Sequence, residues 1–358
     1  MKITILYAYR NRELDRIKRS LDSLKLQLLQ NFEVLFIDYG SKKQMAYEVK
    51  SLIGNYDFAT YEYLYTELQP WNKSKALNYA IKNLNSEYFF TADIDIIFHP
   101  EFTSILQKKC CPDKATYFQV GYLSKEESKK ELFFERYTIK FYSNEEATGM
   151  TLFPVDVIKK SRGYDEFFHF WGSEDTEIHN RLKKEGFEVE YYNHKIVLLH
   201  QWHKNYRNRE TKGLNTELQL TGIVEINSVH LLKKYERKER NETSNEWGRV
   251  LSKEELQELE SIKTKVLSNE KKVIDYFLYQ ELPFFNHEII AFNIKENPFK
   301  NSFKYKLKIF LGKKVPQFYN LKEINDKLLL HIISFYHQFP YTYKISQDLQ
   351  NIEFKIKK

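Results

Sequence analysis

Apolar residues along the first part of the chain follow two alternating periods, which predict strands and helices in turn. Runs rich in apolar and β-branched residues predict buried strands at 2–8, 32–38, 58–65 and 89–98. Apolar residues spaced by three and four predict the helices between them at 14–28, 44–53 and 74–84. Strands that alternate with helices indicate right-handed βαβ units and a mostly parallel sheet. In such sheets ligands bind beyond the carboxyl ends of the strands.

The pattern continues to about residue 200. Further strands are predicted at 116–122, 148–153 and 187–199, with a charged helical stretch at 125–135 between the first two. Another helix begins after Ser173, which we expect to cap it, and ends at Gly186.

The composition changes after about residue 210. Glycine becomes rare, and residues 215–270 are rich in Glu, Lys and Leu, as in long exposed helices. We therefore expect an α/β domain at 1–210 and a mostly helical C-terminal region at 211–358. Within that region, residues 297–322 carry seven lysines and no acidic residue, and the apolar residues among them fit an alternating strand or one face of a helix equally. This segment is either a solvated basic face or a contact with an anionic membrane.

Two carboxylates interrupt the apolar run at 89–98. Asp93 and Asp95 are separated by one residue, so on a strand their side chains share one face. Buried carboxylates without a partner cost several kcal/mol each, so something must neutralise them. A divalent cation, alone or with a sugar hydroxyl, satisfies this requirement, and so does a nearby salt bridge.

Two lysines stand at the start of the helix at 74–84, for which we expect Ser74 to be the cap. Lys73 and Lys75 oppose the helix dipole there by a few tenths of a kcal/mol. They are explained by an anion that docks against the free N–H groups, or they are ordinary surface lysines.

A second group of candidate residues follows Trp171. Glu174, Asp175 and Glu177 fall in the first turn of the helix after Ser173, where they stabilise its dipole or supply an acid/base group. His200 and His203 end the strand pattern at 187–199. They are either ordinary residues at a strand end or ligands that complete a metal site begun by Asp95.

Composition and charge set broad limits. The net charge of +7 suits an anionic small substrate, an anionic membrane or nucleic acid, and does not choose among them. The two cysteines, Cys110 and Cys111, are adjacent, which excludes a disulfide framework and a cysteine-rich zinc site. The chain enters a strand pattern without a signal-peptide pattern, and no apolar run reaches the roughly 18 residues of a membrane span. We therefore expect a cytoplasmic protein.

Several motifs follow one another in a characteristic order. They are Tyr9-Arg10-Asn11-Arg12-Glu13, Trp71-Asn72-Lys73-Ser74-Lys75-Ala76-Leu77-Asn78, Asp93-Ile94-Asp95, Gly163-Tyr164-Asp165-Glu166, Trp171-Gly172-Ser173-Glu174-Asp175-Thr176-Glu177, Arg181 and His200. This series resembles the GT-A glycosyltransferases, most closely the β-1,4-galactosyltransferases and the bacterial chondroitin-polymerase-like family 2 enzymes. The likeness covers roughly residues 1–210, and the tail from 211 has no recognised counterpart.

The resemblance implies a GT-A type, Rossmann-like sheet flanked by helices and an inverting transfer from a UDP-sugar. It implies that Asp38 holds the uracil, and that the nucleotide and diphosphate are lined by Tyr9, Arg10, Arg12 and Lys75. Asp93 is expected to contact the ribose or the metal.

The resemblance also implies the catalytic and metal-binding residues. Asp95 and His200 would ligate Mn²⁺ or Mg²⁺. The methionine ligand of the galactosyltransferases corresponds here to Val197, which cannot ligate, so water or His203 takes that place. Asp175 is expected to be the general base, with Glu174 orienting the acceptor and Trp171 on a mobile loop over the sugar.

The chemistry of such a transfer suits these residue types. A diphosphate leaving group needs its charge held by a divalent cation and basic side chains. An acceptor hydroxyl needs a carboxylate to take its proton as it attacks the anomeric carbon. A single base on the face opposite the leaving group gives inversion.

Three hypotheses follow. The first is an enzyme that moves a hexose or N-acetylhexosamine from a UDP-sugar to a hydroxyl of a glycan or glycolipid, with possible peripheral membrane contact through 297–322. The second is a non-catalytic nucleotide-sugar or carbohydrate-binding partner of a glycan-synthesis complex, against which the presence of all the motif carboxylates argues. The third is a nucleic-acid-binding protein, suggested by charge alone, and we expect no nucleic-acid partner because no motif supports one.

Overall fold

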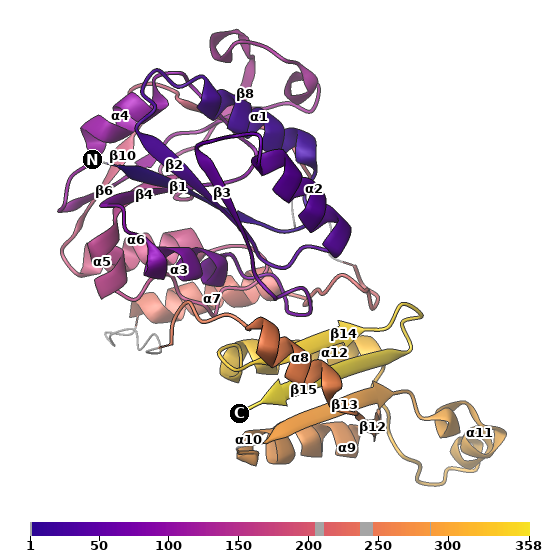
Figure 1. Cartoon of the computed structure of the whole chain (residues 1–358). Helices are drawn as coiled ribbons and strands as arrows, with labels where there is room; N and C mark the ends of the chain where they lie inside the picture. The colour runs from indigo at the N-terminus through magenta and orange to yellow at the C-terminus, as the bar shows by residue number, and fades with distance from the viewer. Residues whose placement is uncertain (1, 205–210, 237–245, 287) are drawn as a thin grey trace. The chain divides into compact units, whose positions relative to one another are not determined.

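The computed structural model describes residues 2–204, 211–236, 246–286 and 288–358 (Figure 1). The chain divides into two compact units. The N-terminal unit consists of Met1–Glu67, Asn72–Asn208 and Val224–Arg249, and the C-terminal unit of Leu68–Trp71, Arg209–Ile223 and Val250–Lys358. The predicted division at 210/211 therefore differs from the structure by one long helix, because residues 224–236 belong with the N-terminal unit.

A seven-stranded sheet forms the centre of the N-terminal unit, in the order β10-β6-β9-β4-β1-β2-β3. Its strands are β1 (Ile3–Tyr9), β2 (Phe32–Asp38), β3 (Ala59–Tyr63), β4 (Tyr88–Ala92), β6 (Lys114–Phe118), β9 (Thr151–Pro154) and β10 (Glu188–Tyr192). All neighbouring pairs are parallel except those of β9, which runs antiparallel to β4 and β6. The prediction of a mixed, mostly parallel sheet is confirmed.

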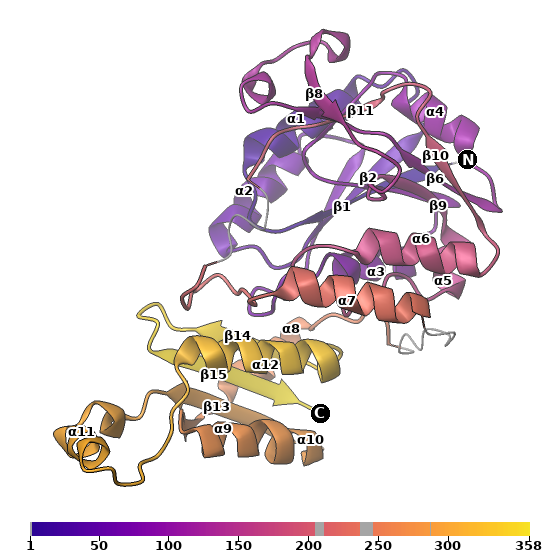
Figure 2. The ribbon, with the colours of Figure 1, turned by 180° about the vertical axis from the view of Figure 1, so that it is seen from behind.

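Helices cover both faces of this sheet (Figures 1 and 2). One face carries α1 (Leu14–Lys25), α2 (Lys43–Ile53) and α4 (Phe102–Lys109), and the other carries α3 (Lys73–Asn83), α5 (Val155–Lys160), α6 (Glu174–Lys184) and α7 (Ile223–Glu236). Ile17, Leu21 and Leu24 of α1 pack into the main hydrophobic core, which explains the spacing seen in the sequence.

A smaller sheet extends the N-terminal unit, in the order β5-β11-β7-β8. It is formed by β5 (Ile96–Phe98), β11 (Leu198–His200), β7 (Gly121–Leu123) and β8 (Ile139–Tyr142). Ile96 of β5 lies directly opposite His200 of β11. This pairing brings the residues that follow β4 together with the residues that end β11.

Four local predictions are corrected. The run 89–98 is not one strand, because β4 ends at Ala92 and Asp93–Asp95 form a turn before β5. The run 116–122 likewise divides into β6 and β7. The stretch 125–135 forms only two short 3₁₀ turns, η1 (Glu127–Lys129) and η2 (Phe134–Arg136), since it buries almost no apolar surface. The α3 cap is Asn72, whose side chain accepts a hydrogen bond from the Lys75 N–H, and not Ser74.

The C-terminal unit contains more helix than strand, but the sequence did not predict the sheet at its centre. The C-terminal unit is built on a four-stranded sheet in the order β12-β13-β15-β14, formed by Lys265–Ser268, Ile289–Lys295, Asn351–Lys357 and Tyr341–Ile345 respectively. In β15 the buried Ile352, Phe354 and Ile356 alternate with charged residues. That period of two is hard to see in a segment so rich in lysine and glutamate.

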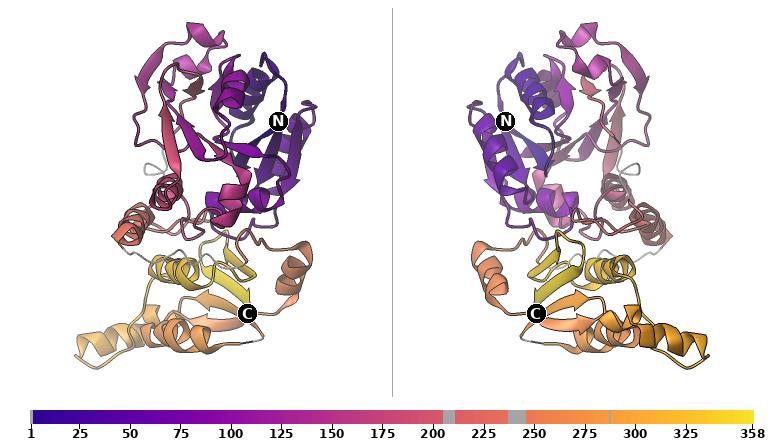
Figure 3. Two further views of the ribbon diagram at one scale, coloured as in Figure 1. Left: turned by 90° about the vertical axis from the view of Figure 1, so that its left-hand side faces the viewer. Right: turned by 90° about the vertical axis from the view of Figure 1, so that its right-hand side faces the viewer.

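Helices lie on both faces of this second sheet (Figures 2 and 3). One face carries α12 (Leu321–Phe335) and α9 (Lys271–Tyr276), which continues through the π-helical turn η4 (Phe277–Glu281) into α10 (Leu282–Phe284), and the other carries α8 (Lys253–Ser261). The remaining elements are η5 (Pro298–Asn301) and α11 (Phe303–Phe310). Across the described ranges, no helix has the length and apolar character needed to cross a bilayer.

Candidate active site

One partly buried lysine joins three carboxylates at the carboxyl edge of the large sheet. The Nζ atom of Lys73 lies 3.0 Å from Asp175 Oδ2, 3.4 Å from Asp93 Oδ1 and 3.7 Å from Glu174 Oε1. Lys73 comes from the first turn of α3, Asp93 from the end of β4, and the other two from the first turn of α6. The structure therefore brings the Asp93 motif and the Trp171–Glu177 motif into one site, as the sequence predicts.

Asn72 fixes the position of Lys73. Its Oδ1 accepts a hydrogen bond from the Lys75 N–H at 2.8 Å, and its Nδ2 donates to the Glu166 carbonyl at 2.8 Å. The start of α3 is thereby tied to the segment that leads into α6. The sequence predicts Lys73 as an anion contact or a surface lysine. It does not predict the contact with Asp175, because 102 residues separate the two.

Burial and charge shift the pKa values in this cluster in opposite directions. Burial, together with Glu174 and Asp93, raises the pKa of Asp175 to about 7, although Lys73 acts in the other direction. Burial also raises the pKa of Asp93, but Lys73 and the nearby histidines outweigh it, and the net pKa lies below the usual range. Burial lowers the pKa of Lys73, and the three carboxylates more than reverse this.

Asp175 keeps one oxygen available. Its Oδ2 contacts Lys73, whereas its buried Oδ1 has no hydrogen-bond partner among the described residues. Gly149 leaves room for this side chain, since a Cβ at position 149 would lie 3.2 Å from Asp175 Oδ2. A partly buried carboxylate with a raised pKa and a free oxygen is suited to accept a proton.

Glu177 and Arg181 have a structural role. The Glu177 carboxylate accepts two hydrogen bonds from Arg181, at 3.1 and 3.0 Å. Arg181 also donates to the carbonyls of Ser161 and Gly163 at 2.7 and 2.6 Å. These contacts fasten α6 to the loop that precedes it, so Glu177 does not belong to the reactive cluster.

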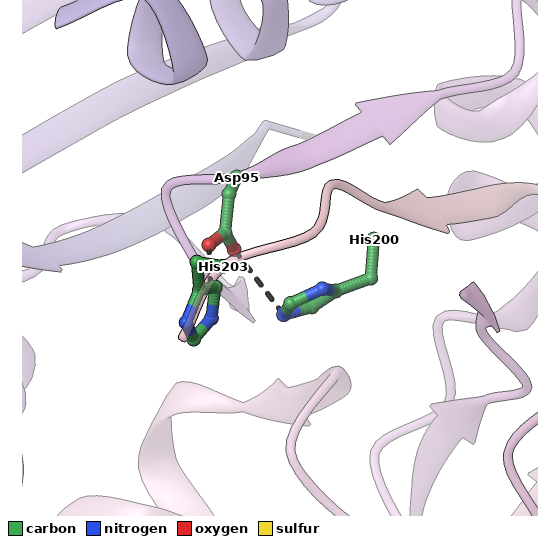
Figure 4. Close-up of side chains that lie close together, drawn as sticks. All are labelled: Asp95, His200 and His203. Atoms are coloured by element: carbon green, nitrogen blue, oxygen red, sulfur yellow. Dashed lines mark ion pairs between the residues drawn. The ribbon is translucent and has the colours of Figure 1, made fainter. Parts of the chain in front are cut away.

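Asp95, His200 and His203 form a second cluster (Figure 4). The Nε2 atom of His200 lies 3.5 Å from Asp95 Oδ1, and the Nε2 atom of His203 lies 3.3 Å from Asp95 Oδ2. One ligand atom from each of the three residues lies within 4.8 Å of the other two. Arg16 of α1 lies 3.4 Å from Asp95 Oδ2. The turn after β4 thus directs Asp93 toward Lys73 and Asp95 toward the histidines.

The surroundings of the two histidines suit metal binding. His203 Nδ1 lies 2.9 Å from the Lys204 carbonyl, so it carries the proton and leaves Nε2 free as a ligand. Burial lowers the pKa of His203, which favours the neutral form that binds metals. The His200 ring stacks on Tyr122, with centroids 4.9 Å apart, and Tyr122 stacks on Phe141.

These observations test whether a divalent cation fits the second cluster. Asp95 Oδ1 is buried and makes no hydrogen bond to any residue in the described ranges. A buried oxygen of this kind beside two histidine nitrogens is the donor set of a two-histidine, one-carboxylate cation site. Both histidines fit as ligands. Val197, at the position of the galactosyltransferases' methionine ligand, is fully buried in the hydrophobic core, and His203 is the third residue of the cluster.

The residues assigned to the nucleotide lie near the carboxyl ends of β1 and β2, with the exception of Lys75. Asp38 is fully buried, and its two oxygens accept hydrogen bonds from the Ser41 N–H at 2.7 Å and the Tyr61 hydroxyl at 2.8 Å. Burial raises the pKa of Asp38. Contact between this carboxylate and a uracil therefore requires Tyr61 to give up its hydrogen bond or to share the oxygen.

The neighbouring side chains are also held by backbone groups. Arg10 donates to the carbonyls of Thr66 and Glu67, and the Tyr9 hydroxyl donates to the Arg12 carbonyl at 3.0 Å. Lys75 is buried in the first turn of α3. These hydrogen bonds hold Tyr9 and Arg10 in place, and Arg12 is half-buried.

The segment that carries Trp171 has an unusual backbone. Phe170, Gly172 and Ser173 all have positive φ, at 63°, 100° and 77°. Such angles are costly for residues other than glycine and must be held by their surroundings. Ser173 occupies the cap position of α6, but its side chain makes no capping hydrogen bond within the described part of the chain, which corrects the prediction. The Trp171 side chain is 46% exposed.

Helix α7 holds this segment, which sequence reasoning did not predict. The Nδ2 atom of the buried Asn227 donates to the carbonyls of His169 and Trp171, both at 3.0 Å. His230 Nε2 lies 3.0 Å from Asp165 Oδ2, and Lys234 pairs with the same carboxylate. The Trp171 loop is therefore positioned by a helix some 55 residues further along the chain.

Comparison with known protein families agrees with this geometry. Residues 4–157 match the model described as glycosyl transferase family 2, and residues 129–215 match the model described as the N-terminal domain of galactosyltransferase. Together they span 4–215, more than half of the chain. The fold and the matches define a GT-A glycosyltransferase. Within that class, residues 4–157 are similar to glycosyltransferase family 2.

Solved structures show more distant likenesses. TarS from S. aureus, residues 1–349 in complex with UDP, is 16% identical with a TM-score of 0.42, over 56% of this chain and 60% of that structure. The mannosyltransferase PcManGT from Pyrobaculum calidifontis, in complex with GDP-Man and Mn²⁺, is 17% identical with a TM-score of 0.41, over 57% and 58%. GalNAc-T7 with UDP, GalNAc and Mn²⁺ is 12% identical with a TM-score of 0.45, over 66% and 50%. The chain thus matches less than two thirds of each structure's length. No curated protein matches the chain.

We expect Asp95→Ala, His200→Ala and His203→Ala each to weaken the binding of Mn²⁺ by more than about tenfold, since loss even of a residue that supports a ligand costs 10- to 100-fold in metal affinity. Calorimetric titration of the protein with Mn²⁺ alone measures this. His194→Ala, at an exposed histidine outside the cluster, is the matched control. Unchanged affinity in both histidine variants of the cluster would exclude it as a cation site.

We expect Asn227→Ala to loosen the Trp171 loop and to lower the free energy of unfolding by about 1–3 kcal/mol, because two buried carbonyls lose their donor. Hydrogen exchange of the amides at 169–173 should rise, while Mn²⁺ affinity should not change. Ser228→Ala, at an exposed residue on the same helix, serves as the control. Exchange at 169–173 that is the same in both variants would show that α7 does not hold the loop.

Proposed function

We propose that the protein is a metal-dependent, inverting glycosyltransferase that moves a hexose or N-acetylhexosamine from a UDP-sugar to a hydroxyl of a glycan or glycolipid. The observation that carries the proposal is the contact of Lys73 with Asp175, Glu174 and Asp93. Asp93 is two residues before Asp95 of the cation site. A base and a site for the charged leaving group therefore lie side by side. The UDP donor is supported by the galactosyltransferase match at 129–215.

Asp95, His200 and His203 would hold the cation, and two imidazole ligands favour Mn²⁺ over Mg²⁺, which prefers oxygen ligands. When bound, a divalent cation there would neutralise charge on the diphosphate leaving group. Arg16 lies beside Asp95 and would add positive charge at the same place. Lys73 would also add positive charge near the diphosphate, on the side of Asp93.

Asp175 is the proposed general base. The acceptor oxygen attacks the anomeric carbon as the bond from that carbon to the diphosphate oxygen breaks, and UDP leaves with the bonding electrons. The hydroxyl proton passes to Asp175, whose Oδ1 is the available acceptor. Glu174, next to it at the start of α6, would orient the acceptor, and Trp171 would lie over the sugar. One displacement by this route inverts the configuration at the anomeric carbon.

A binding role without catalysis is the alternative. A partner that only holds a nucleotide-sugar needs the pocket but no base. The partly buried Asp175, with its raised pKa, favours the enzyme, because an ionisable group kept in a costly environment needs a function to explain it.

We further propose that the protein works in the cytoplasm at the inner face of a membrane, where a lipid-linked acceptor would be presented. The basic segment 297–322 supports this proposal, since its seven lysines suit an anionic surface.

The test of the function is Mn²⁺-dependent turnover with a panel of UDP-sugars that differ at single hydroxyls or substituents. We expect one or two of them to be hydrolysed or transferred, and Asp175→Asn to abolish turnover while UDP-sugar affinity stays within a few-fold. Asp156→Asn, an exposed carboxylate of the same unit, is the control. Normal turnover of Asp175→Asn would remove Asp175 from the role of base, and binding without turnover in the unmodified protein would favour the alternative.

The pH dependence provides a second test. Asp175 must be ionised to act as a base, so kcat/KM for the donor, which reports the free enzyme, should rise about tenfold per pH unit on the acid side. It should level off above about pH 7. Lys73→Met removes a cation that lowers the pKa of Asp175, so its acid limb should move to higher pH, whereas Lys82→Met, an exposed lysine of the same helix, should not shift it. A flat profile from about pH 5.5 to about pH 8.5 would contradict the assignment.

A further inference from the structure

Helix α11 exposes a continuous apolar stripe. Phe303 and Phe310 are 79% and 86% exposed, and Leu307 and Leu311 are 43% and 54% exposed. In an α-helix, residues at spacings of three, four and seven lie on one face. These four residues therefore form a single surface, which we call the α11 stripe. Exposed apolar clusters of this kind mark interaction sites more often than isolated apolar residues do.

The α11 stripe points outward because another face of the helix is already packed. Tyr305 contacts Phe299 and Phe318, with ring centroids 5.5 and 5.6 Å away, and its hydroxyl donates to the Pro316 carbonyl at 3.2 Å. Ser302 caps the helix through the Tyr305 N–H, and Gly312, with a φ of 66°, ends it. Figures 1 and 3 show α11 projecting from the four-stranded sheet of its unit.

Lysines flank the stripe on both sides. Lys304 and Lys306 lie next to Phe303 at helix angles about 100° and 60° away, and Lys313 and Lys314 follow the end of the helix. No acidic residue occurs from 297 to 322. Long lysine side chains beside an apolar stripe can keep their ammonium groups at a lipid headgroup region while the stripe enters the acyl boundary.

We propose that the α11 stripe docks onto the surface of an anionic bilayer. The helix has eight residues, too short to span a membrane, and would lie in the plane of the interface. Charge decides between this partner and a second copy of the chain, because two lysine-flanked stripes facing each other repel. The aliphatic Leu307 and Leu311 favour hydrocarbon over stacked nucleic-acid bases, which need aromatic or guanidinium planes.

This inference deepens the proposed membrane contact and rests on that proposal only for the location of the acceptor. Lipid binding is measured without any donor sugar, and transfer to a soluble acceptor is measured without lipid. Loss of vesicle binding with intact transfer would overturn the inference alone, and absent transfer with intact vesicle binding would overturn the proposed enzyme alone.

The experiment is sedimentation of the full chain with phosphatidylcholine vesicles, with or without about 30% phosphatidylglycerol. We expect binding only to the anionic vesicles, weakened at least about tenfold in Phe303→Ser/Phe310→Ser and about 100-fold in Lys304→Gln/Lys306→Gln/Lys308→Gln. Phe284→Ser, an exposed phenylalanine elsewhere in the C-terminal unit, should bind like the unmodified chain.

Three outcomes would overturn the proposal. One is absence of binding to anionic vesicles by the unmodified chain, and another is equal binding by Phe303→Ser/Phe310→Ser. The third is a concentration-dependent dimer or an RNA complex that this double variant abolishes while vesicle binding persists. Unchanged circular dichroism of the double variant shows that loss of binding is not loss of folding, since both side chains are exposed.

Discussion

The ion cluster around Lys73 is the interaction on which the catalytic part of the structure depends. Three carboxylates, Asp93, Glu174 and Asp175, lie within reach of one ammonium group. Without that cation, like charges in a buried position would repel one another and could not all remain ionised. The start of α3 is an unfavourable place for a lysine with respect to the helix dipole, and the carboxylates offset that cost. The same contact joins α3, β4 and α6, so it fixes the geometry and the electrostatics together.

Because of the turn after β4, the two aspartates of the Asp93-Ile94-Asp95 motif have different partners. On a continuous strand both side chains would face the same partner. The turn instead lets Asp93 reach Lys73 while Asp95 reaches His200 and His203, and the Gln201 N–H donates to the Asp95 carbonyl at 3.0 Å to hold this arrangement. The cluster around Lys73 and the cluster of Asp95, His200 and His203 are thus adjacent but share no side chain.

The sequence predicted those features that arise from local pattern. The parallel strands β1 to β4 are near-continuous apolar runs, and α1 and α6 have clear periods and end signals, so their existence and the site at their carboxyl ends could be read directly. The partners of Lys73 and Asn227 could not be predicted from the sequence. Contacts between residues 102 and 58 positions apart leave no periodic pattern. The C-terminal sheet was missed for a different reason: in β15 the apolar residues alternate with Glu and Lys, residue types that also favour helices.

The contacts of α7 bear on where the catalytic unit ends. The family matches stop at residue 215, yet the backbone of the Trp171 loop has positive φ at Phe170 and Ser173, two residues that do not favour it. Asn227 supplies the donors for two carbonyls of that loop, and His230 and Lys234 neutralise Asp165 just before it. A strained loop persists only when its surroundings determine it. The functional unit therefore includes α7, and a chain shortened to the matched residues would keep the reactive side chains but lose the support that positions Trp171.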